Sequence, residues 1–309
     1  MRAVWWLEVG PPSVLVPGDA PDPIAGPDQV LIRVEAAGIT FIETQTRAGR
    51  APRATITPPA ILGNGVGGTT QDGRRVVSSL GGAGGYAELA VAAAADVLDV
   101  PDGVSITEAT ALLADGRTAL GLHQLVAPQP GETVLVEAAA GGVGSLLVQL
   151  AVAAGATVIG AASGERKRAV VRDLGASATL DYTEPGWADA LPTKVDVVYD
   201  GVGGSIGQAA LAALAPGGRF VIHGVASGSM TDTATRSDAT VLGFAELMKL
   251  GRRHRELSAE ALALAAKGRL HPVIGQTYPL EQAADAHAAI EARRSIGKSL
   301  LLTDPDRPR

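Results

Sequence analysis

A glycine-rich segment with the sequence EAAAGGVGSLLVQ, Glu137–Gln149, separates two apolar runs of the chain. It places Gly141, Gly142 and Gly144 at an expected strand-to-helix junction. Glycine weakens helices and strands, so such a cluster needs a reason. At a helix N-terminus, glycines let an anion approach the backbone, and the unpaired N–H groups and helix dipole attract its charge. The segment therefore predicts phosphate binding, and the alternative is a tight turn without a ligand.

The spacing of the small residues partly fits the dinucleotide-binding pattern G-x-G-x-x-G. Ala139 takes the first place, Gly141 the second and Gly144 the third, while Gly142 is additional. A small residue stands at each critical place, so close approach of a pyrophosphate remains sterically possible. We interpret the segment as the phosphate turn of a dinucleotide fold.

The residues after the second expected strand bear on the choice of dinucleotide. This strand ends IGAAS, without the acid that would bind a ribose 2′-hydroxyl and indicate NAD. Ser163 and Lys167 follow, and a lysine with basic neighbours can neutralise a 2′-phosphate, which favours NADP. Glu165 argues for NAD, because its carboxylate could accept a hydrogen bond from the ribose. The basic residues also have a simpler interpretation as a solvated helix start.

Alternating strands and helices must position this turn. From Thr133 onward, continuous apolar strands such as TVLVEAA and VDVVYDG alternate with helical segments, which predicts a doubly wound parallel sheet. Among these helical segments, we expect IGQAALAALAPGG to form a helix over 206–218 and AELMKLGRRHRELSAEALALAAKG to form one over 245–268. Residues before about 115 form short strands separated by Gly and Pro, which indicates a β-rich domain. Ser105 precedes Glu108 by three positions, a capping-box pattern that predicts the start of a helix. We expect a β-rich substrate domain over 1–118, a dinucleotide domain over 119–256, and a return to the first domain over 257–309.

The composition excludes several kinds of chemistry. The chain has 309 residues, 46% hydrophobic content, a net charge of -6 and no cysteine, so disulfides and cysteine metal sites are impossible. The acidic balance and short basic runs argue against nucleic acid as a partner. No apolar run is long enough for a membrane span, and the N-terminus lacks signal-peptide features, so we expect a cytoplasmic protein. The five histidines are scattered and predict no metal site.

Several further segments, taken in chain order, resemble one known superfamily. AAGITFIETQTRAG, GRRVV, GGYAELAV, ALLADGRTAL, AAAGGVG, VDVVYDGVGG, GGRFVIHGVASG and the tail YPLEQAADAHAAIEARRSIGKSLLL follow one another. Together they resemble the zinc-independent medium-chain dehydrogenase/reductase superfamily, in its quinone oxidoreductase (zeta-crystallin-like) branch. The resemblance implies an α/β fold, with a GroES-like β-rich domain and a doubly wound Rossmann parallel-sheet domain that close around NADPH.

The resemblance also assigns roles to individual residues of this sequence. It implies substrate-cleft positions at Thr40, Phe41, Gln45 and Asn64. It implies cofactor contacts at Thr118, Gly141, Gly142, Val143, Gly144, Ser163, Lys167, Tyr182, Gly224, Ala226, Ser227, Phe244 and Lys298.

Three departures from the family pattern affect the expected site. Gly63, Asn64 and Gly65 stand where zinc-dependent relatives have Gly-His-Glu; without cysteines as well, we expect no catalytic zinc. Gln45 replaces a frequent tyrosine and Thr40 an asparagine, so the pocket is altered. The segment GTTQDG, at 68–73, predicts a shortened hairpin.

These observations predict an enzyme that transfers a hydride from NADPH to a quinone or similar conjugated carbonyl without a metal. One alternative is an enoyl or 2-alkenal reductase, including one of polyketide biosynthesis, and another is a non-catalytic nucleotide-binding protein. His223 is interpreted as a packed strand residue rather than a proton donor, and Asp200 as structural. An apolar strand near 239–244 predicts a homodimer that extends the sheet across a two-fold axis.

Overall fold

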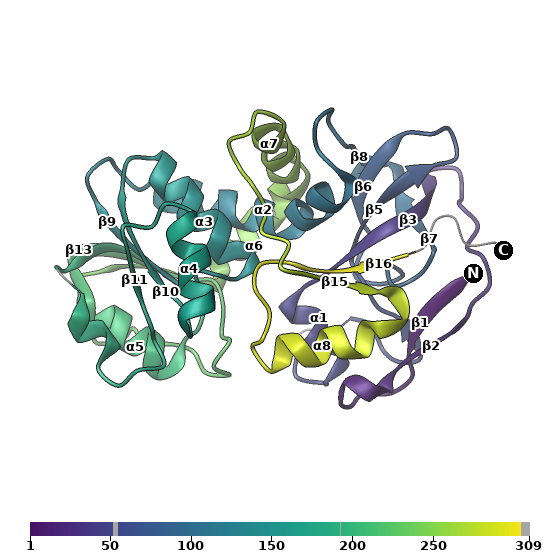
Figure 1. Ribbon diagram of the computed structural model, residues 1–309. Coiled ribbons are helices and arrows are strands. Elements are labelled where there is room, and N and C mark those ends of the chain that lie inside the picture. Colours follow the sequence, from purple (N-terminus) through teal and green to yellow (C-terminus); the bar gives the residue numbers. More distant parts are fainter. Residues whose placement is uncertain (52–54, 192, 304–309) are drawn as a thin grey trace. The chain divides into compact units, whose positions relative to one another are not determined.

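The computed structural model describes residues 1–51, 55–191 and 193–303. Contacts divide the chain into two compact units (Figure 1): unit 1 contains Met1–Ala114 and Ser258–Arg309, and unit 2 contains Asp115–Leu257. The domain boundaries expected at residues 118 and 256 stay a prediction.

Unit 1 is rich in antiparallel strands. A three-stranded sheet has the order β2-β1-β4, and a seven-stranded sheet has the order β15-β16-β3-β5-β6-β8, with β7 also paired to β3. The strands are β1 Arg2–Trp6, β2 Leu15–Asp19, β3 Gln29–Ile39, β4 Ala60–Ile61, β5 Gly65–Thr70, β6 Arg75–Ser79, β7 Leu89–Ala93, β8 Leu98–Asp99, β15 Gln276–Pro279 and β16 Ser299–Leu302. The prediction of a β-rich domain is confirmed.

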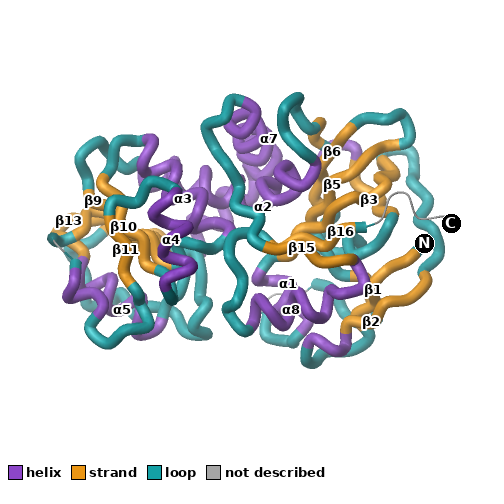
Figure 2. Tube along the Cα trace, viewed as in Figure 1, coloured by secondary structure: helices purple, strands orange, loops and turns teal. Residues whose placement is uncertain are grey.

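Strand β3 organises the larger sheet of unit 1. It pairs antiparallel with β5, β7 and β16, and the register with β5 shifts between Val34 and Ala36. Ser299 of β16 lies opposite Ile39 of β3, so the C-terminal strand completes this sheet of unit 1. Helices α1 (Phe41–Arg47) and α8 (Ala283–Glu291) lie side by side in this unit (Figure 2).

Unit 2 contains a six-stranded parallel sheet of order β11-β10-β9-β12-β13-β14. The strands are β9 Thr133–Glu137, β10 Thr157–Ala161, β11 Ala178–Leu180, β12 Val195–Asp200, β13 Leu214–Ile222 and β14 Thr240–Leu242. Helices α3 (Gly142–Ala153) and α4 (Glu165–Asp173) lie on one side of the sheet and α5 (Gly204–Ala213) on the other (Figure 1). The predicted doubly wound Rossmann sheet is confirmed. Its strand order reverses between β9 and β12, where such folds bind ligands.

Two helix predictions need correction. The helix expected over 206–218 ends at Ala213, because β13 begins at Leu214 and pairs with Val195 before a register shift. The helix expected over 245–268 is interrupted: α6 spans Phe244–Leu250, a 3-10 turn spans Gly251–Arg253, and α7 spans His254–Ala266.

Helix α2, Ile106–Val126, starts where the sequence predicted. The Ser105 N–H donates to Glu108 Oε2 over 2.9 Å, and the Glu108 N–H donates to Ser105 Oγ over 3.2 Å, so the capping box is confirmed. Among the described residues, no helix combines the length and the apolar character that crossing a bilayer requires.

Candidate functional site

The phosphate turn lies between β9 and α3, at the switch point of the unit 2 sheet. The Gly141 N–H donates to the Ala138 carbonyl over 2.8 Å and closes the turn. Ala138, rather than a glycine, has the left-handed conformation, with φ of 47°. Ser145 makes the first backbone bond of the helix, to Gly141. The N–H groups of the three residues before it therefore point out of the helix N-terminus, as an anion site requires.

The three glycines of this turn differ in what a side chain at each position would contact. A Cβ at Gly144 would overlap the Ala138 carbonyl and lie 2.9 Å from its carbon, so this position lets the helix pack against the turn. A Cβ at Gly142 would overlap the carboxylate of Asp115, and one at Gly141 would meet only the Ala138 oxygen, at 3.1 Å. We expected Gly142 to matter for approach of the cofactor, but its immediate constraint is Asp115.

The expected adenosine-side residues follow β10 and β11. Ser163 and Lys167 are half-buried, whereas Tyr182 is only 9% exposed and packs in the apolar core beside Trp187. Glu165 binds Arg172 and Arg168, so its carboxylate is already paired.

Asp181 directly follows β11 and contacts the segment after β10, although its local sequence does not single it out. Its Oδ2 accepts a hydrogen bond of 2.7 Å from the N–H of Gly164, at the start of α4. The carboxylate comes from the end of β11 and not of β10, so a search for an acid at the end of the second strand does not find it.

The expected nicotinamide-side residues Gly224, Ala226 and Ser227 follow β13 closely. A Cβ at Gly224 would overlap the Gly201 carbonyl, so glycine permits the close approach of the two strand ends. The N–H of Ser227 donates to the Val202 carbonyl over 2.8 Å, which fixes this segment along the end of β12.

Two buried carboxyl groups, those of Glu137 and Asp200, lie close together at the ends of β9 and β12. Asp200 accepts hydrogen bonds from Val202 N–H at 3.0 Å, Gly203 N–H at 2.7 Å and Thr231 Oγ1 at 2.6 Å. The structural interpretation of Asp200 therefore agrees with its contacts. Glu137 is fully buried, and burial, followed by the Asp200 charge, raises its pKa well above the ordinary value. Burial of Glu137 beside Asp200 is a feature that the sequence did not suggest.

His223 is the third titratable side chain at this edge. Its Nε2 is buried and has no hydrogen-bond partner among the described residues, and its ring lies against Gly201. Burial, partly opposed by the charge of Asp200, lowers its pKa to about 4. His223 is therefore a neutral imidazole at neutral pH, and a role as a charged proton donor is not supported.

Unit 1 brings two of the predicted substrate-side residues together through Glu43. Its carboxylate accepts from the Thr40 N–H at 2.6 Å, from Thr40 Oγ1 at 2.9 Å and from the Asn64 N–H at 2.7 Å. The Asn64 side chain in turn accepts from the Gly82 N–H at 2.7 Å, so it braces a loop. The spacing T-x-x-E from Thr40 to Glu43 is a capping-box signal that could have identified this carboxylate.

The other substrate-side candidates lie on the same helix, α1. Phe41 is 42% exposed and offers an apolar surface, whereas Gln45 is half-buried. The Gln45 side chain donates to Thr44 Oγ1 at 3.0 Å and accepts from Arg50 Nε at 3.0 Å. Its amide is therefore held by protein groups.

A buried polar network continues behind Glu43. Tyr86 Oη lies 3.5 Å from Glu43 Oε2 and 3.0 Å from His287 Nε2. Lys298, a predicted cofactor residue, is only 4% exposed, and its charge opposes the rise that burial causes in the pKa of Glu43.

The remaining two candidates belong to unit 2. Thr118 is half-buried in α2, and Phe244, 41% exposed, begins α6 directly after β14. The assignment of individual residues to cofactor or substrate stays a prediction.

Comparison with known proteins identifies the family. A quinone oxidoreductase of Pseudomonas aeruginosa is 32% identical over 97% of this chain and 99% of its own length. The chain belongs to the quinone oxidoreductase branch of the medium-chain dehydrogenase/reductase superfamily. A 2-haloacrylate reductase of Burkholderia is 32% identical over 90% of this chain and 91% of its own. The structure of an Escherichia coli quinone oxidoreductase complexed with NADPH matches with a TM-score of 0.88 and 28% identity, over 98% of this chain and 100% of that one.

The family model that matches residues 174–301 is described as a zinc-binding dehydrogenase. Within the described ranges, no three His, Cys, Asp or Glu side chains gather as a metal site would require. The expectation that this family member works without zinc stays a prediction.

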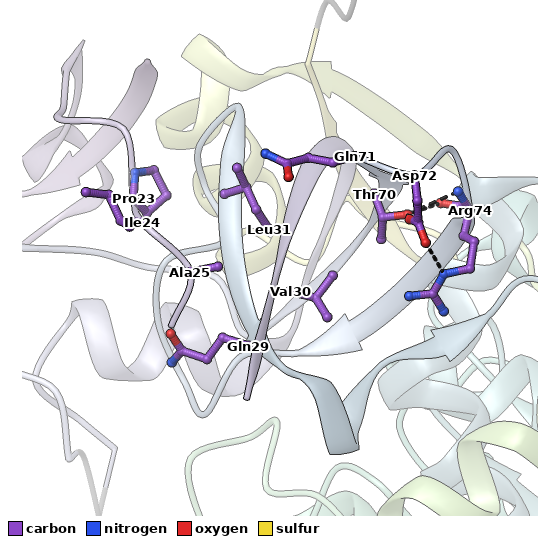
Figure 3. Close-up of a pocket in the computed structure, with 10 residues that line it drawn as sticks. All are labelled: Pro23, Ile24, Ala25, Gln29, Val30, Leu31, Thr70, Gln71, Asp72 and Arg74. Atoms are coloured by element: carbon purple, nitrogen blue, oxygen red, sulfur yellow. Dashed lines mark hydrogen bonds and ion pairs between the residues drawn. The ribbon is translucent and has the colours of Figure 1, made fainter. Parts of the chain in front are cut away.

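An open pocket of about 580 Å³ in unit 1 contains none of the predicted site residues. Its walls include the β5–β6 turn, where Asp72 contacts Thr70 and binds Arg74 Nε at 3.1 Å (Figure 3). The lining residues are Pro23, Ile24, Ala25, Gln29, Val30, Leu31, Thr70, Gln71, Asp72 and Arg74. Since the charges of Asp72 and Arg74 are paired with each other, we assign no ligand to this pocket.

Proposed function

We propose that the protein is an NADPH-dependent reductase that acts on a quinone or similar conjugated carbonyl and needs no metal. The observation that carries the proposal is the phosphate turn, in which glycines open the N-terminus of α3 at the switch point of the sheet. The family relationship over nearly the whole chain supports it. When bound, NADPH supplies a hydride, and water supplies the proton that completes reduction.

The chain's own residues bind and orient the cofactor and the acceptor, and they exclude water from around them. The N–H groups of Gly142, Val143 and Gly144 hold the pyrophosphate, and Ser163 and Lys167 contact the adenosine end. Gly224, Ala226 and Ser227, with Thr118, act at the nicotinamide side, and Phe244 and Lys298 act on the cofactor side. Thr40, Phe41, Gln45 and Asn64 face the acceptor. Positioning and desolvation of the cofactor and the acceptor by these residues can account for the rate of hydride transfer without a catalytic acid and base.

A second candidate function is reduction of an activated carbon–carbon double bond. It is favoured by the similarity to a protein named 2-haloacrylate reductase. An enone or haloacrylate also accepts a hydride at an electron-poor carbon, so the same residues would serve. We further propose a cytoplasmic homodimer in which β14, the edge strand of the unit 2 sheet, pairs with a second copy.

The deciding experiment follows the loss of absorbance at about 340 nm as the reduced nicotinamide is consumed. NADPH and NADH are each tested with 1,4-benzoquinone, 9,10-phenanthrenequinone, a 2-alkenal, a cyclic enone and a 2-haloacrylate. Turnover of quinones supports the first proposal, and turnover restricted to the other acceptors supports the second. Binding of NADPH without any turnover would contradict both and indicate a nucleotide-binding protein.

A further inference from the structure

The loop after β10 is the place where a doubly wound fold selects between NAD and NADP. The strand ends at Ala161 and is followed by Ala162, neither of which carries a polar group. Parallel pairing places Leu180 of β11 beside Ala161, and the Ala162 N–H donates to the Leu180 carbonyl over 3.0 Å. The residue that follows β11 is therefore delivered to the selecting loop.

That residue is Asp181, and its carboxylate is nearly buried, with 12% of the side chain exposed. Oδ2 accepts from the Gly164 N–H at 2.7 Å, and Oδ1 accepts from the Thr183 N–H at 3.0 Å and from Thr183 Oγ1 at 2.5 Å. Burial opposes ionisation, but the hydrogen bonds from Thr183 and Gly164 and the charge of Arg168 lower the pKa of Asp181. A carboxylate offers about four acceptor sites, so one further hydrogen bond can be accepted.

Arg168, a cation beside this carboxylate, is already shared with Glu165. Arg168 Nε lies 3.9 Å from Asp181 Oδ2, and Arg168 Nη2 lies 3.0 Å from Glu165 Oε2. Glu165 also binds Arg172. Two carboxylates therefore compete with an incoming phosphate for the guanidinium of Arg168.

We propose that Asp181 sets the cofactor preference: it accepts a hydrogen bond from an unphosphorylated adenosine ribose and repels a 2′-phosphate, so that the site holds NADH as well as NADPH. The inference rests on the nucleotide site of the proposed function but not on its acceptor. A ribose hydroxyl can donate to Asp181, whereas a phosphate carries only acceptors at neutral pH and adds like charge.

The test measures binding of two adenosine nucleotides to the full chain by isothermal titration calorimetry, without any hydride transfer. Asp181→Asn keeps an oxygen that can accept from Gly164 but removes the charge. We expect adenosine 2′,5′-bisphosphate to bind about tenfold more tightly, the scale of one partly screened charge interaction. Adenosine 5′-monophosphate should bind equally or more weakly. Asp173→Asn, an exposed change of the same charge at the other end of α4, should alter neither affinity.

Arg168→Gln gives an independent test if Asp181→Asn does not fold. We expect it to weaken binding of the bisphosphate more than binding of the monophosphate, because the remaining Asp181 charge is then unopposed. An unchanged ratio of the two affinities in both variants would overturn the inference. Failure of both nucleotides to bind the unaltered protein would overturn it together with the nucleotide site. The expected ratios without quinone turnover would support it and remove only the proposed acceptor.

Discussion

Glu43 of unit 1 and Glu137 of unit 2 are both buried, with 5% and 0% of the residue exposed, but their surroundings differ. Glu43 meets two N–H donors, a hydroxyl and the charge of Lys298, all of which oppose the effect of burial on its pKa. Glu137 meets the carboxylate of Asp200, whose charge adds to the rise that burial causes in the pKa of Glu137. Burial raises the pKa of both groups, and the neighbouring groups decide how far each pKa rises.

The largest expected effect is the loss of Glu43. Glu43→Leu should lower the free energy of unfolding by about 3 kcal/mol, because the buried N–H groups of Thr40 and Asn64 lose their acceptor. Urea unfolding monitored by tryptophan fluorescence measures the change. Glu8→Leu, at an exposed position, is the control and should change stability by less than about 0.5 kcal/mol. Equal effects of the two substitutions would mean that Glu43 does not fix the start of α1.

The next effect is the pH dependence caused by Glu137. Its pKa in the folded state is above the unfolded value of 4.5, so its contribution to stability is complete below pH 4.5 and is lost as the pH rises toward the folded pKa. Glu137→Gln cannot ionise. The stability of the wild type relative to this variant should therefore fall by about 1.4 kcal/mol per pH unit across that window. Parallel stability–pH curves would contradict a raised pKa of Glu137.

His223 should give a pH dependence of stability of opposite sign. Its pKa falls from 6.5 to about 4 in the folded protein, so its contribution is present above pH 6.5 and is lost as the pH falls toward 4. His223→Gln should reduce this loss of stability at acidic pH. A thermal-unfolding series from pH 4 to pH 7 measures the change. The exposed His271, replaced by Gln, serves as the control and should leave the loss of stability at acidic pH unchanged.

The smallest expected effect is the pH dependence of stability caused by Glu43 in unit 1. Glu43 also has a raised pKa, but the donors around it limit the rise. Glu43→Gln should therefore show a pH-dependent difference from the wild type over a narrower window above pH 4.5 than Glu137→Gln does. Measuring both variants in one pH series compares the two widths directly, and a wider window for Glu43 would reverse the comparison.

The predictable features depend on local sequence. The strand–helix alternation after Thr133 was sufficient for the parallel sheet, and Ser105 with Glu108 for the start of α2. The strand character of Leu214–Gly218 was missed because Pro and Gly suggested a helix end, while pairing with β12 decides the outcome. Asp181 was missed because its role depends on Gly164, which is distant in sequence but adjacent through the pairing of β10 with β11. Glu137 was missed for the same reason, since its partner Asp200 lies on another strand.

The return of β16 to β3 has a consequence for synthesis on the ribosome. Unit 2 is continuous in sequence, so its sheet can form as soon as residue 257 emerges. Strand β3 can pair early with β5 and β7, but the edge that β16 covers stays open until residues 299–302 appear. The nascent chain therefore carries an uncovered strand edge through the translation of an entire second unit, a period in which pairing with another nascent chain competes with the native partner.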